Sequence, residues 1–372
     1  MKKKINIGLI LLVVCICITI SLFIFAEGRE KGKTNKTLEV TIADAGKLSV
    51  GEGKKNVAKI SKRVNVVNVI QLPIADASEP EWSPDGNWIV FTKCPVPSIS
   101  PGEEWTYTGI YKTDVNGTNT VVLYQQNGQI AETPQWSPDG TKIAFHLIKE
   151  DTSYGDGEVT IHDRGDIWVM NSDGSGLRQL TTSADTTCID TFSWLPDGLK
   201  IIYQAFIDKP IPRYEALFSI SITGREPQRI FTEKDVEVEG KIWTPFAGFD
   251  IKRDNKVNGE YKIWAMLLIP SATPEKGLWE DYYELWTMDL DGKNPVSKMD
   301  LELAGSYSPD MSKVVGIIDS KICFANIDGN DLQETEYNGT HIRWSPVENK
   351  IVYEWFDQEG NHLCIMTVEV EE

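Results

Sequence analysis

A five-residue motif, Trp-Ser-Pro-Asp-Gly, recurs along this chain and limits its possible folds more than any other feature. Six copies, intact, substituted or shortened, begin at Trp82, Trp136, Trp194, Trp243, Tyr307 and Trp344. The six starts are 54, 58, 49, 64 and 37 residues apart. A repeat of this length indicates one structural unit per copy, because a single unit cannot bury its apolar face alone. We therefore predict a fold built from six similar units.

The segment Ser-Pro-Asp-Gly has the composition of a turn between two β-strands. Proline fixes φ at about −65° at the second turn position. Glycine accepts the left-handed conformation that ends a type I turn with a bulge. A short apolar run, typical of a strand, follows every copy of the motif. These runs are Trp88–Phe91, Ile143–Phe145, Ile201–Tyr203, Ile263–Met266, Val314–Val315 and Ile351–Tyr353.

A second motif recurs later in each unit. Its best copy, Ile167–Gly174, reads Ile-Trp-Val-Met-Asn-Ser-Asp-Gly. Related copies are Ile110–Gly117, Leu217–Gly224, Leu285–Gly292 and Ile322–Gly329. The polar end predicts a second hairpin, and a short strand such as Leu177–Leu180 follows it. Each unit therefore supplies four strands, which we name A to D in chain order.

Two different motifs that recur in the same order resemble the repeat of TolB-type (WD40-like, PD40) propeller proteins. The resemblance covers residues 62–372. It implies an all-β fold, a six-bladed β-propeller of four-stranded antiparallel blades. TolB itself carries an N-terminal α/β domain, which we expect to be missing here, because only about 35 residues separate the N-terminal apolar run from the repeats. The partners of TolB are therefore not transferred to this chain.

The last unit has room for strands A, B and C only. It ends in the strand-like run Leu363–Val370, and another such run, Val64–Ile70, precedes the first motif. We predict that Val64–Ile70 pairs beside Leu363–Val370 as the outer strand of blade six. Both ends of the repeat region would then join one blade and close the ring.

The N-terminal segment has the pattern of a membrane anchor. Three lysines at positions 2–4 precede Ile7–Ala26, a run of 20 residues without charge. Such a helix spans about 30 Å, the thickness of a bilayer core, and the lysines favour a cytoplasmic N-terminus. We expect a single transmembrane helix in residues 1–26, a stalk in 27–61 and an extracytoplasmic propeller in 62–372, at the cell membrane. The alternative is a signal peptide cleaved after Ala26, which would release a secreted or periplasmic domain.

Charge and motifs narrow the classes of function. The formal net charge of −18 would repel phosphates, so nucleic acid is not an expected partner. No P-loop, Rossmann or HExxH motif occurs, and histidines such as His146 and His341 form no paired spacing. The Asp-x-Asp-Gly stretches fit turns better than calcium loops, so no cofactor or metal is expected. Four widely spaced cysteines are expected to be buried thiols: Cys94, Cys188, Cys323 and Cys364.

Strand direction alternates within a blade, so the loops separate onto two faces. The B–C loops and D–A crossings share one face, and the A–B and C–D hairpins share the other. One long A–B insertion, Phe246–Glu260, is expected after the copy at Trp243. Long loops on a rigid scaffold commonly carry binding function. The B–C loops are long in four blades: Cys94–Gly109, Lys149–Gly165, Ile207–Ala216 and Pro270–Tyr283.

The predicted binding residues come from these long loops: Trp105, Tyr154, His162, Trp279 and Tyr282. An aromatic and acidic rim suits a sugar, a cationic ligand or a basic protein surface. We predict a non-catalytic recognition or scaffold module that binds a protein or polysaccharide partner at the cell envelope. Two alternatives stay open: a propeller enzyme that acts on carbohydrate as a lyase does, and a purely structural envelope component.

Overall fold

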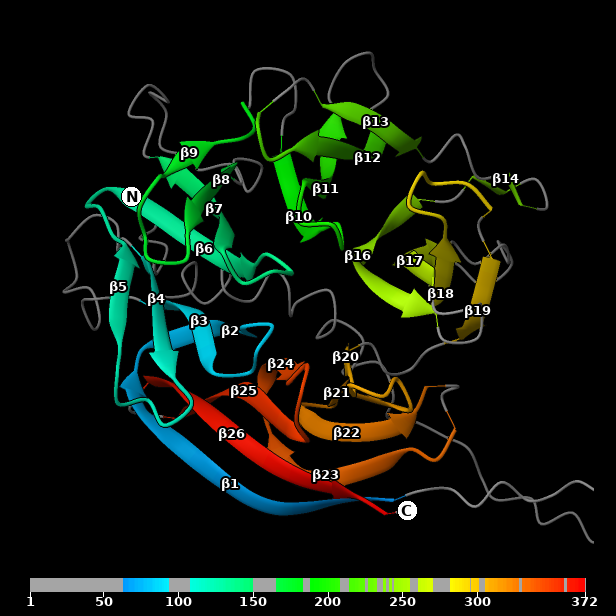
Figure 1. Ribbon diagram of the computed structural model, residues 1–372. Coiled ribbons are helices and arrows are strands. Elements are labelled where there is room, and N and C mark those ends of the chain that lie inside the picture. Colours follow the sequence, from blue (N-terminus) through cyan, green and yellow to red (C-terminus); the bar gives the residue numbers. More distant parts are fainter. Residues whose placement is uncertain are drawn as a thin grey trace, which may run out of the picture. The chain divides into compact units, whose positions relative to one another are not determined.

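The computed structural model describes the repeat region between Arg63 and Glu371, with gaps. The described residues are 63–93, 108–149, 165–182, 188–207, 214–224, 227–232, 237–238, 241–242, 244–254, 260–269, 282–294, 296–300, 305–327, 330–357 and 360–371. Within them, every regular element is a β-strand. The strands form six four-stranded antiparallel sheets and one two-stranded sheet (Figure 1).

The four-stranded sheets follow one another along the chain, and we number them in that order. Sheet one contains β2 (Ala77–Trp82), β3 (Trp88–Lys93), β4 (Gly109–Asp114) and β5 (Val121–Tyr124). Sheet two contains β6 (Gln129–Trp136), β7 (Lys142–Lys149), β8 (Asp166–Asn171) and β9 (Arg178–Gln179). Sheet three contains β10 (Cys188–Trp194), β11 (Lys200–Ile207), β12 (Tyr214–Ser221) and β13 (Gln228–Thr232).

The remaining sheets complete the same plan. Sheet four contains β16 (Thr244–Asp254), β17 (Glu260–Ile269), β18 (Tyr282–Met288) and β19 (Val296–Asp300). Sheet five contains β20 (Gly305–Tyr307), β21 (Lys313–Ile318), β22 (Lys321–Asn326) and β23 (Gln333–Asn338). Sheet six contains β24 (Thr340–Trp344), β25 (Lys350–Asp357), β26 (Gly360–Val370) and β1 (Val64–Ala75). The two-stranded sheet consists of β14 (Glu237–Val238) and β15 (Lys241–Ile242).

The Ser-Pro-Asp-Gly turn has the hydrogen bonds that its composition predicts. The amide of Gly86 donates to the carbonyl of Ser83 at 2.9 Å, and Gly86 has a φ of +71°. The hydroxyl of Ser83 donates to Asp85 Oδ1 at 2.6 Å. Ser137 and Ser308 make the same two contacts in sheets two and five. The motif therefore forms a fixed connection between the first and second strands.

Sheet four departs from the predicted pattern. The expected insertion Phe246–Glu260 is mostly strand, because β16 extends from Thr244 to Asp254. Ile251 pairs with Ile263 at the register where other sheets have the aromatic residue of the motif. The prediction was wrong because Thr244 and Pro245 of the three-letter match are the first residues of β16, whereas in the other sheets the motif lies at the end of the first strand.

Strand β1 forms the outer edge of sheet six. It pairs antiparallel with β26, from Val64 opposite Val370 to Ala75 opposite His362 (Figure 1). The pairing covers the two segments in which it was expected. Apolar side chains of β1, among them Leu72 at 1% exposure, are buried in the core.

Apolar contacts link each sheet to the next within one compact unit, residues 63–372. Trp264 of sheet four and Tyr307 of sheet five have ring centroids 5.7 Å apart. Phe324 of sheet five and Trp344 of sheet six are 5.8 Å apart. Sheet six in turn packs on sheet one, where the indole of Trp82 donates to the carbonyl of Arg343 at 3.1 Å. The core therefore lies between the faces of consecutive sheets.

Two sequence predictions concern residues that the structure describes in part. Cys323 and Cys364 are buried free thiols, as expected, whereas the side chains of Cys94 and Cys188 lie outside the described residues.

No helix in the described segments has the length and apolar character needed to cross a bilayer. The apolar run Ile7–Ala26 also lies outside them, so its role as an anchor stays a prediction.

Candidate functional site

A local distortion recurs in the first strands of the sheets. The pairing of β2, β6, β10 and β24 with their second strands shifts register at the residue three positions before the aromatic residue of the motif. Glu79, Thr133 and His341 stand at this shift with φ values of 52°, 52° and 46°. Positive φ is uncommon for residues other than glycine, and bulges redirect side chains near functional sites. The distortion therefore presents three polar side chains at equivalent positions.

In sheet six, the bulge places His341 against a buried carboxylate. His341 Nδ1 lies 2.6 Å from Glu354 Oε2, and Asn361 Nδ2 donates to Glu354 Oε1 at 2.7 Å. Glu354 is 5% exposed. Burial opposes the charged imidazole, but the hydrogen bond to Glu354 and the charges of Glu354 and Glu79 raise the pKa of His341 above 6.5. The bulge thus builds an ionic contact that depends on pH.

Glu79 extends the polar contacts from sheet one to sheet two. Its Oε2 accepts hydrogen bonds from Thr92 Oγ1 at 2.9 Å and from the backbone amide of Thr133 at 2.7 Å. Thr133 Oγ1 lies 2.9 Å from His146 Nδ1. The His146 ring meets Phe192 of sheet three edge-on, with ring centroids 4.9 Å apart. We call Glu79, Thr133, His146, His341 and Glu354 the polar network.

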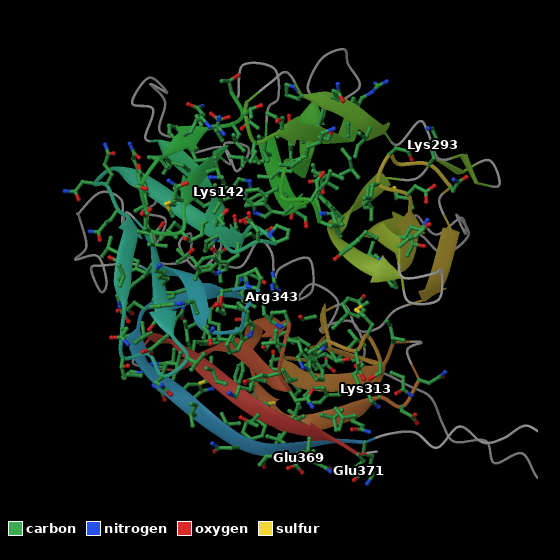
Figure 2. All side chains as sticks on the ribbon, viewed as in Figure 1. Lys142, Lys293, Lys313, Arg343, Glu369 and Glu371 are labelled. Carbon is green, nitrogen blue, oxygen red and sulfur yellow. The ribbon has the colours of Figure 1, made fainter. Side chains whose placement is uncertain are left out.

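A second ion pair lies two residues further along the same strands. Arg343 Nε donates to Glu81 Oε2 at 2.7 Å and so joins β24 to β2; Figure 2 labels Arg343. The two side chains are 47% and 31% exposed. Water therefore screens the pair, which adds little to stability. Its charges remain accessible to a ligand at this end of the sheets.

The equivalent positions in sheets four and five lack polar side chains. Met266 in β17 and Ile317 in β21 occupy the position that Glu354 has in β25. Strand β16 has no register shift opposite this position, because Gly248 pairs with Met266. Sheet three has Thr191 at the bulge position and Gln204 at the position of Glu354. All six sheets share one backbone plan, so the fold itself does not require polar residues here. Polar side chains are therefore concentrated on one part of the set of sheets, and we take the polar network as the candidate functional site.

The five residues predicted from the long loops are not brought together in the described structure. Tyr282 is the first residue of β18, where its backbone pairs with Ile269. The other four lie outside the described residues: Trp105, Tyr154, His162 and Trp279. The binding role of all five residues therefore stays a prediction.

The polar network lies at the same end of the strands as these loops. Thr92 is the last residue but one of β3, and the chain then enters residues 94–107, which contain Trp105. Second strands end where first strands begin, because the two are antiparallel. The bulges near the starts of β2, β6 and β24 therefore share one face with the B–C loops, which we call the loop face.

The sequence contained a signal for these residues that letter-by-letter reading missed. Glu79, Thr133 and His341 each stand three residues before the aromatic residue of the repeat motif. His146 and His341 were interpreted singly, as histidines without a motif. Alignment of the repeats outward from the motif would have shown that they contribute to one site.

The chemistry of the polar network is that of hydrogen bonding and proton exchange. Among the described residues, no group of three or more His, Cys, Asp or Glu is arranged to hold a metal ion. Both oxygens of Glu354 already accept hydrogen bonds. The network can therefore present fixed charges and polar groups to a ligand at the loop face.

Comparison with known proteins gives two named peptidases. No family model matches the chain. It is 25% identical over 204 residues to the uncharacterized peptidase YuxL of Bacillus subtilis (strain 168), which covers 54% of this chain and 25% of that protein. It is 24% identical over 281 residues to the probable dipeptidyl-peptidase 5 of Aspergillus clavatus, which covers 71% and 36%. The chain thus spans about a quarter to a third of the length of these relatives.

Solved structures similar to this chain include propeller proteins. The putative TolB from Agrobacterium tumefaciens matches with a TM-score of 0.46 and 16% identity, over 84% of this chain and 99% of that chain. An oligogalacturonate lyase in complex with manganese matches with a TM-score of 0.49 and 12% identity, over 83% and 97%. TolB and other propeller proteins are therefore among the structures that this chain is similar to, as the repeats predict.

Proposed function

We propose that the chain forms a closed six-bladed β-propeller. Six four-stranded sheets support this proposal, together with the contacts of each sheet with the next and of sheet six with sheet one. The pairing of β1 with β26 supports closure within one blade. Deletion of residues 1–70 should then abolish cooperative unfolding, because sheet six loses its outer strand. Unchanged cooperative unfolding of the truncated protein, followed by circular dichroism, would argue against closure through β1.

The propeller is proposed to lie outside the cytoplasm, held at the membrane by residues 1–26. The support is the uncharged run Ile7–Ala26 after three lysines. A reporter enzyme fused after Glu372 should be active only outside the cytoplasm. Activity inside would contradict export, whereas a mature N-terminus at Glu27 would replace the anchor with a cleaved signal peptide.

The proposed function is recognition of a protein or polysaccharide partner at the loop face. The observation that carries it is the polar network, which gathers on sheets six, one and two, whereas sheets four and five have the apolar residues Met266 and Ile317 at the position of Glu354. The long B–C loops begin and end on the same face. A fixed polar surface on the face that these loops leave and re-enter suits binding.

Binding is favoured over glycoside hydrolysis because the carboxylates of the network are already engaged. Glu354 accepts hydrogen bonds on both oxygens, and Glu79 accepts two on one oxygen. Glycoside hydrolysis requires a pair of carboxyl groups directed at the scissile bond from both sides. Groups that are hydrogen-bonded to one another instead provide a pre-organised surface.

The test compares the two faces of the propeller. The full-length protein in detergent is assayed for binding to arrays of envelope polysaccharides and to purified envelope proteins. The double variant Trp105→Ala, Trp279→Ala should lose binding, because aromatic anchors typically contribute at least about 2 kcal/mol each. The control is Leu199→Ala, a 60% exposed apolar residue on the β10–β11 hairpin of the other face. Binding that survives the loop variant and is lost in the control would place the site on the hairpin face.

A second candidate function is an enzyme acting on carbohydrate. The observation that favours it is the partly buried His341, whose pKa is raised by the neighbouring carboxylates of Glu354 and Glu79. Such a group can act as a general acid. The substrates to test are oligogalacturonate and a chromogenic dipeptide, because similar proteins are named as a lyase and as peptidases. Turnover of either substrate should be lost in His341→Gln. Absence of turnover in the wild-type protein would leave recognition as the function.

A further inference from the structure

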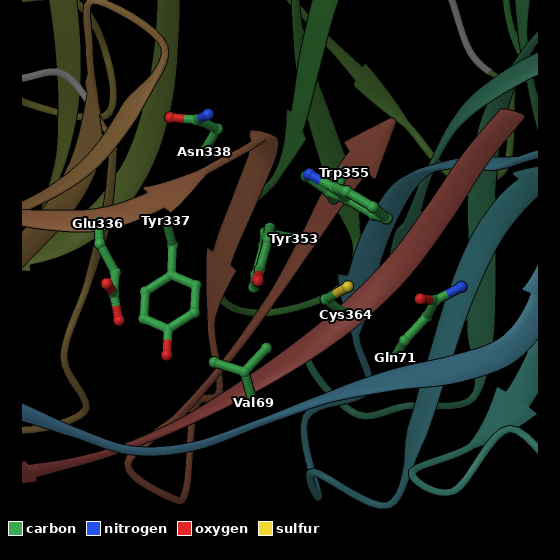
Figure 3. Close-up of a pocket in the computed structure, with 8 residues that line it drawn as sticks. All are labelled: Val69, Gln71, Glu336, Tyr337, Asn338, Tyr353, Trp355 and Cys364. Carbon is green, nitrogen blue, oxygen red and sulfur yellow. The ribbon is translucent and has the colours of Figure 1, made fainter. Parts of the chain in front are cut away.

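A pocket between sheets five and six is separate from the polar network. It is open to solvent, has a volume of about 370 Å³ and is lined by side chains of β1, β23, β25 and β26 (Figure 3). Pockets that hold small ligands typically measure roughly 300–1,000 Å³. The space is therefore large enough for one or two sugar rings.

Aromatic side chains form much of the pocket wall. Figure 3 shows Tyr337, Tyr353 and Trp355 around one opening. One side of Trp355 packs on His362, with ring centroids 5.5 Å apart and an angle of 31° between the planes. Tyr353 is 2% exposed, and burial raises the pKa of its hydroxyl and that of the Cys364 thiol beside it. The floor of the pocket is therefore uncharged at neutral pH.

Besides the polar atoms of the aromatic rings and the thiol, the pocket is lined by two amides and one carboxylate. Gln71 Nε2 donates to His362 Nδ1 at 3.0 Å, and His362 Nε2 donates to Asp357 Oδ1 at 3.1 Å. These two bonds orient the amide of Gln71 and leave its carbonyl oxygen for a ligand. Asn338 and Glu336 are exposed residues of β23 that also line the pocket. No lysine or arginine is among the lining residues, so the site opposes anions.

We propose that this pocket binds a neutral sugar residue. The aromatic rings provide apolar surfaces for the C–H faces of a sugar ring, and the amides and the carboxylate can bond its hydroxyl groups. An acidic sugar is repelled by Glu336. A quaternary ammonium ion would use the rings but leave the amides of Gln71 and Asn338 without a role. The site is independent of the loop face, and a sugar can bind here whatever partner the loops hold.

The experiment is isothermal titration of the full-length protein in detergent. The probes are neutral oligosaccharides of glucose, xylose and N-acetylglucosamine, with oligogalacturonate and choline as comparators. At least one neutral oligosaccharide should bind, at least about tenfold more tightly than oligogalacturonate. Asn338→Ala should weaken its binding about tenfold, the effect of one lost hydrogen bond to a ligand. Glu336→Gln should improve oligogalacturonate binding, whereas the matched control Glu334→Gln, in the same strand but outside the pocket, should change neither affinity.

The outcomes that overturn this inference are specific. No binding of any neutral oligosaccharide at millimolar concentration overturns it, as does unchanged affinity in both Asn338→Ala and Tyr337→Ala. Binding of choline in place of sugar would assign a cation site. Sugar binding that is lost in Trp105→Ala, Trp279→Ala but kept in Asn338→Ala would assign the sugar to the loop face, and so contradict the pocket while supporting the proposed function. Asn338 is exposed, so its substitution leaves the fold intact.

Discussion

The two ends of the first strands differ in how much their residues vary between sheets. At the hairpin end, the serine of the motif makes the same turn in sheets one, two and five. At the bulged end, the equivalent residues are Glu79, Thr133 and His341 in three sheets and Thr191 in a fourth. One end is therefore constrained by the fold, while the other is available for a chemistry that changes from sheet to sheet.

Contacts between neighbouring hairpins explain the constraint. A Cβ added to Gly86 would lie 2.4 Å from Val347 Cγ2 in the hairpin of sheet six. A Cβ added to Gly140 would lie 3.8 Å from Pro84 Cδ in the hairpin of sheet one. Residues on this end must therefore suit both their own turn and the adjacent sheet.

The largest effect is expected at the bulged end itself. Glu354→Ala leaves His341 and Asn361 without their buried acceptor, and should lower the free energy of unfolding by about 3 kcal/mol. Urea denaturation measures this change. The control Glu348→Ala removes an exposed carboxylate near the hairpin end and should cost less than about 1 kcal/mol. Equal losses in the two variants would remove the distinction between the ends.

The next largest effect is expected at the hairpin end, where two glycine substitutions distinguish backbone strain from steric crowding. Gly86→Ala should lower the free energy of unfolding by about 2 kcal/mol, because its φ is positive and its Cβ meets Val347. Gly140→Ala carries the same φ of +71° without the close contact, and should cost about 1 kcal/mol. Thermal unfolding of both variants tests the order. A larger loss in Gly140→Ala would show that neighbouring hairpins do not limit this residue.

The bulged end should lose stability as the pH rises. Because the pKa of folded His341 is raised above 6.5, its contribution is complete below pH 6.5 and is lost as the pH rises through the folded pKa. Unfolding free energies measured across this range should fall in the wild-type protein and change less in His341→Gln. A variant that keeps the full pH dependence would exclude His341 as its source.

At the hairpin end, the free energy of unfolding should decrease as the pH falls. This is the smallest of the expected effects. The hydroxyls of Ser83 and Ser137 hold the pKa values of Asp85 and Asp139 below 3.8. Their contribution is present above pH 3.8 and is lost as the pH falls below it. The double variant Asp85→Asn, Asp139→Asn should therefore flatten the acid limb of the stability profile, and leave the limb above pH 6.5 unchanged. Solvent exposure of both carboxylates keeps the effect small.

Sequence reasoning was successful where a feature depends on residues close together in the chain. The turn around Gly86 and the strand at Val64–Ile70 followed from local composition alone. It failed for the Trp-Thr-Pro copy, whose letters did not reveal that Thr244 and Pro245 begin a strand instead of ending one. It also missed the contacts of Glu79 and His341, because these depend on a bulge and on side chains from other strands, none of which a local motif encodes.

The pairing of β1 with β26 also has a consequence for the order in which the sheets form during folding. Asn65 bonds to Glu371 across 306 positions of the chain, so the ribosome delivers one partner long before the other. Contacts of such separation form late in folding. Until then β1 is an open edge that carries Val67 and Ile70, the kind of segment that joins to other chains. Sheet six is therefore the last to be completed, and the interval before β26 emerges is when a nascent chain is most prone to aggregate.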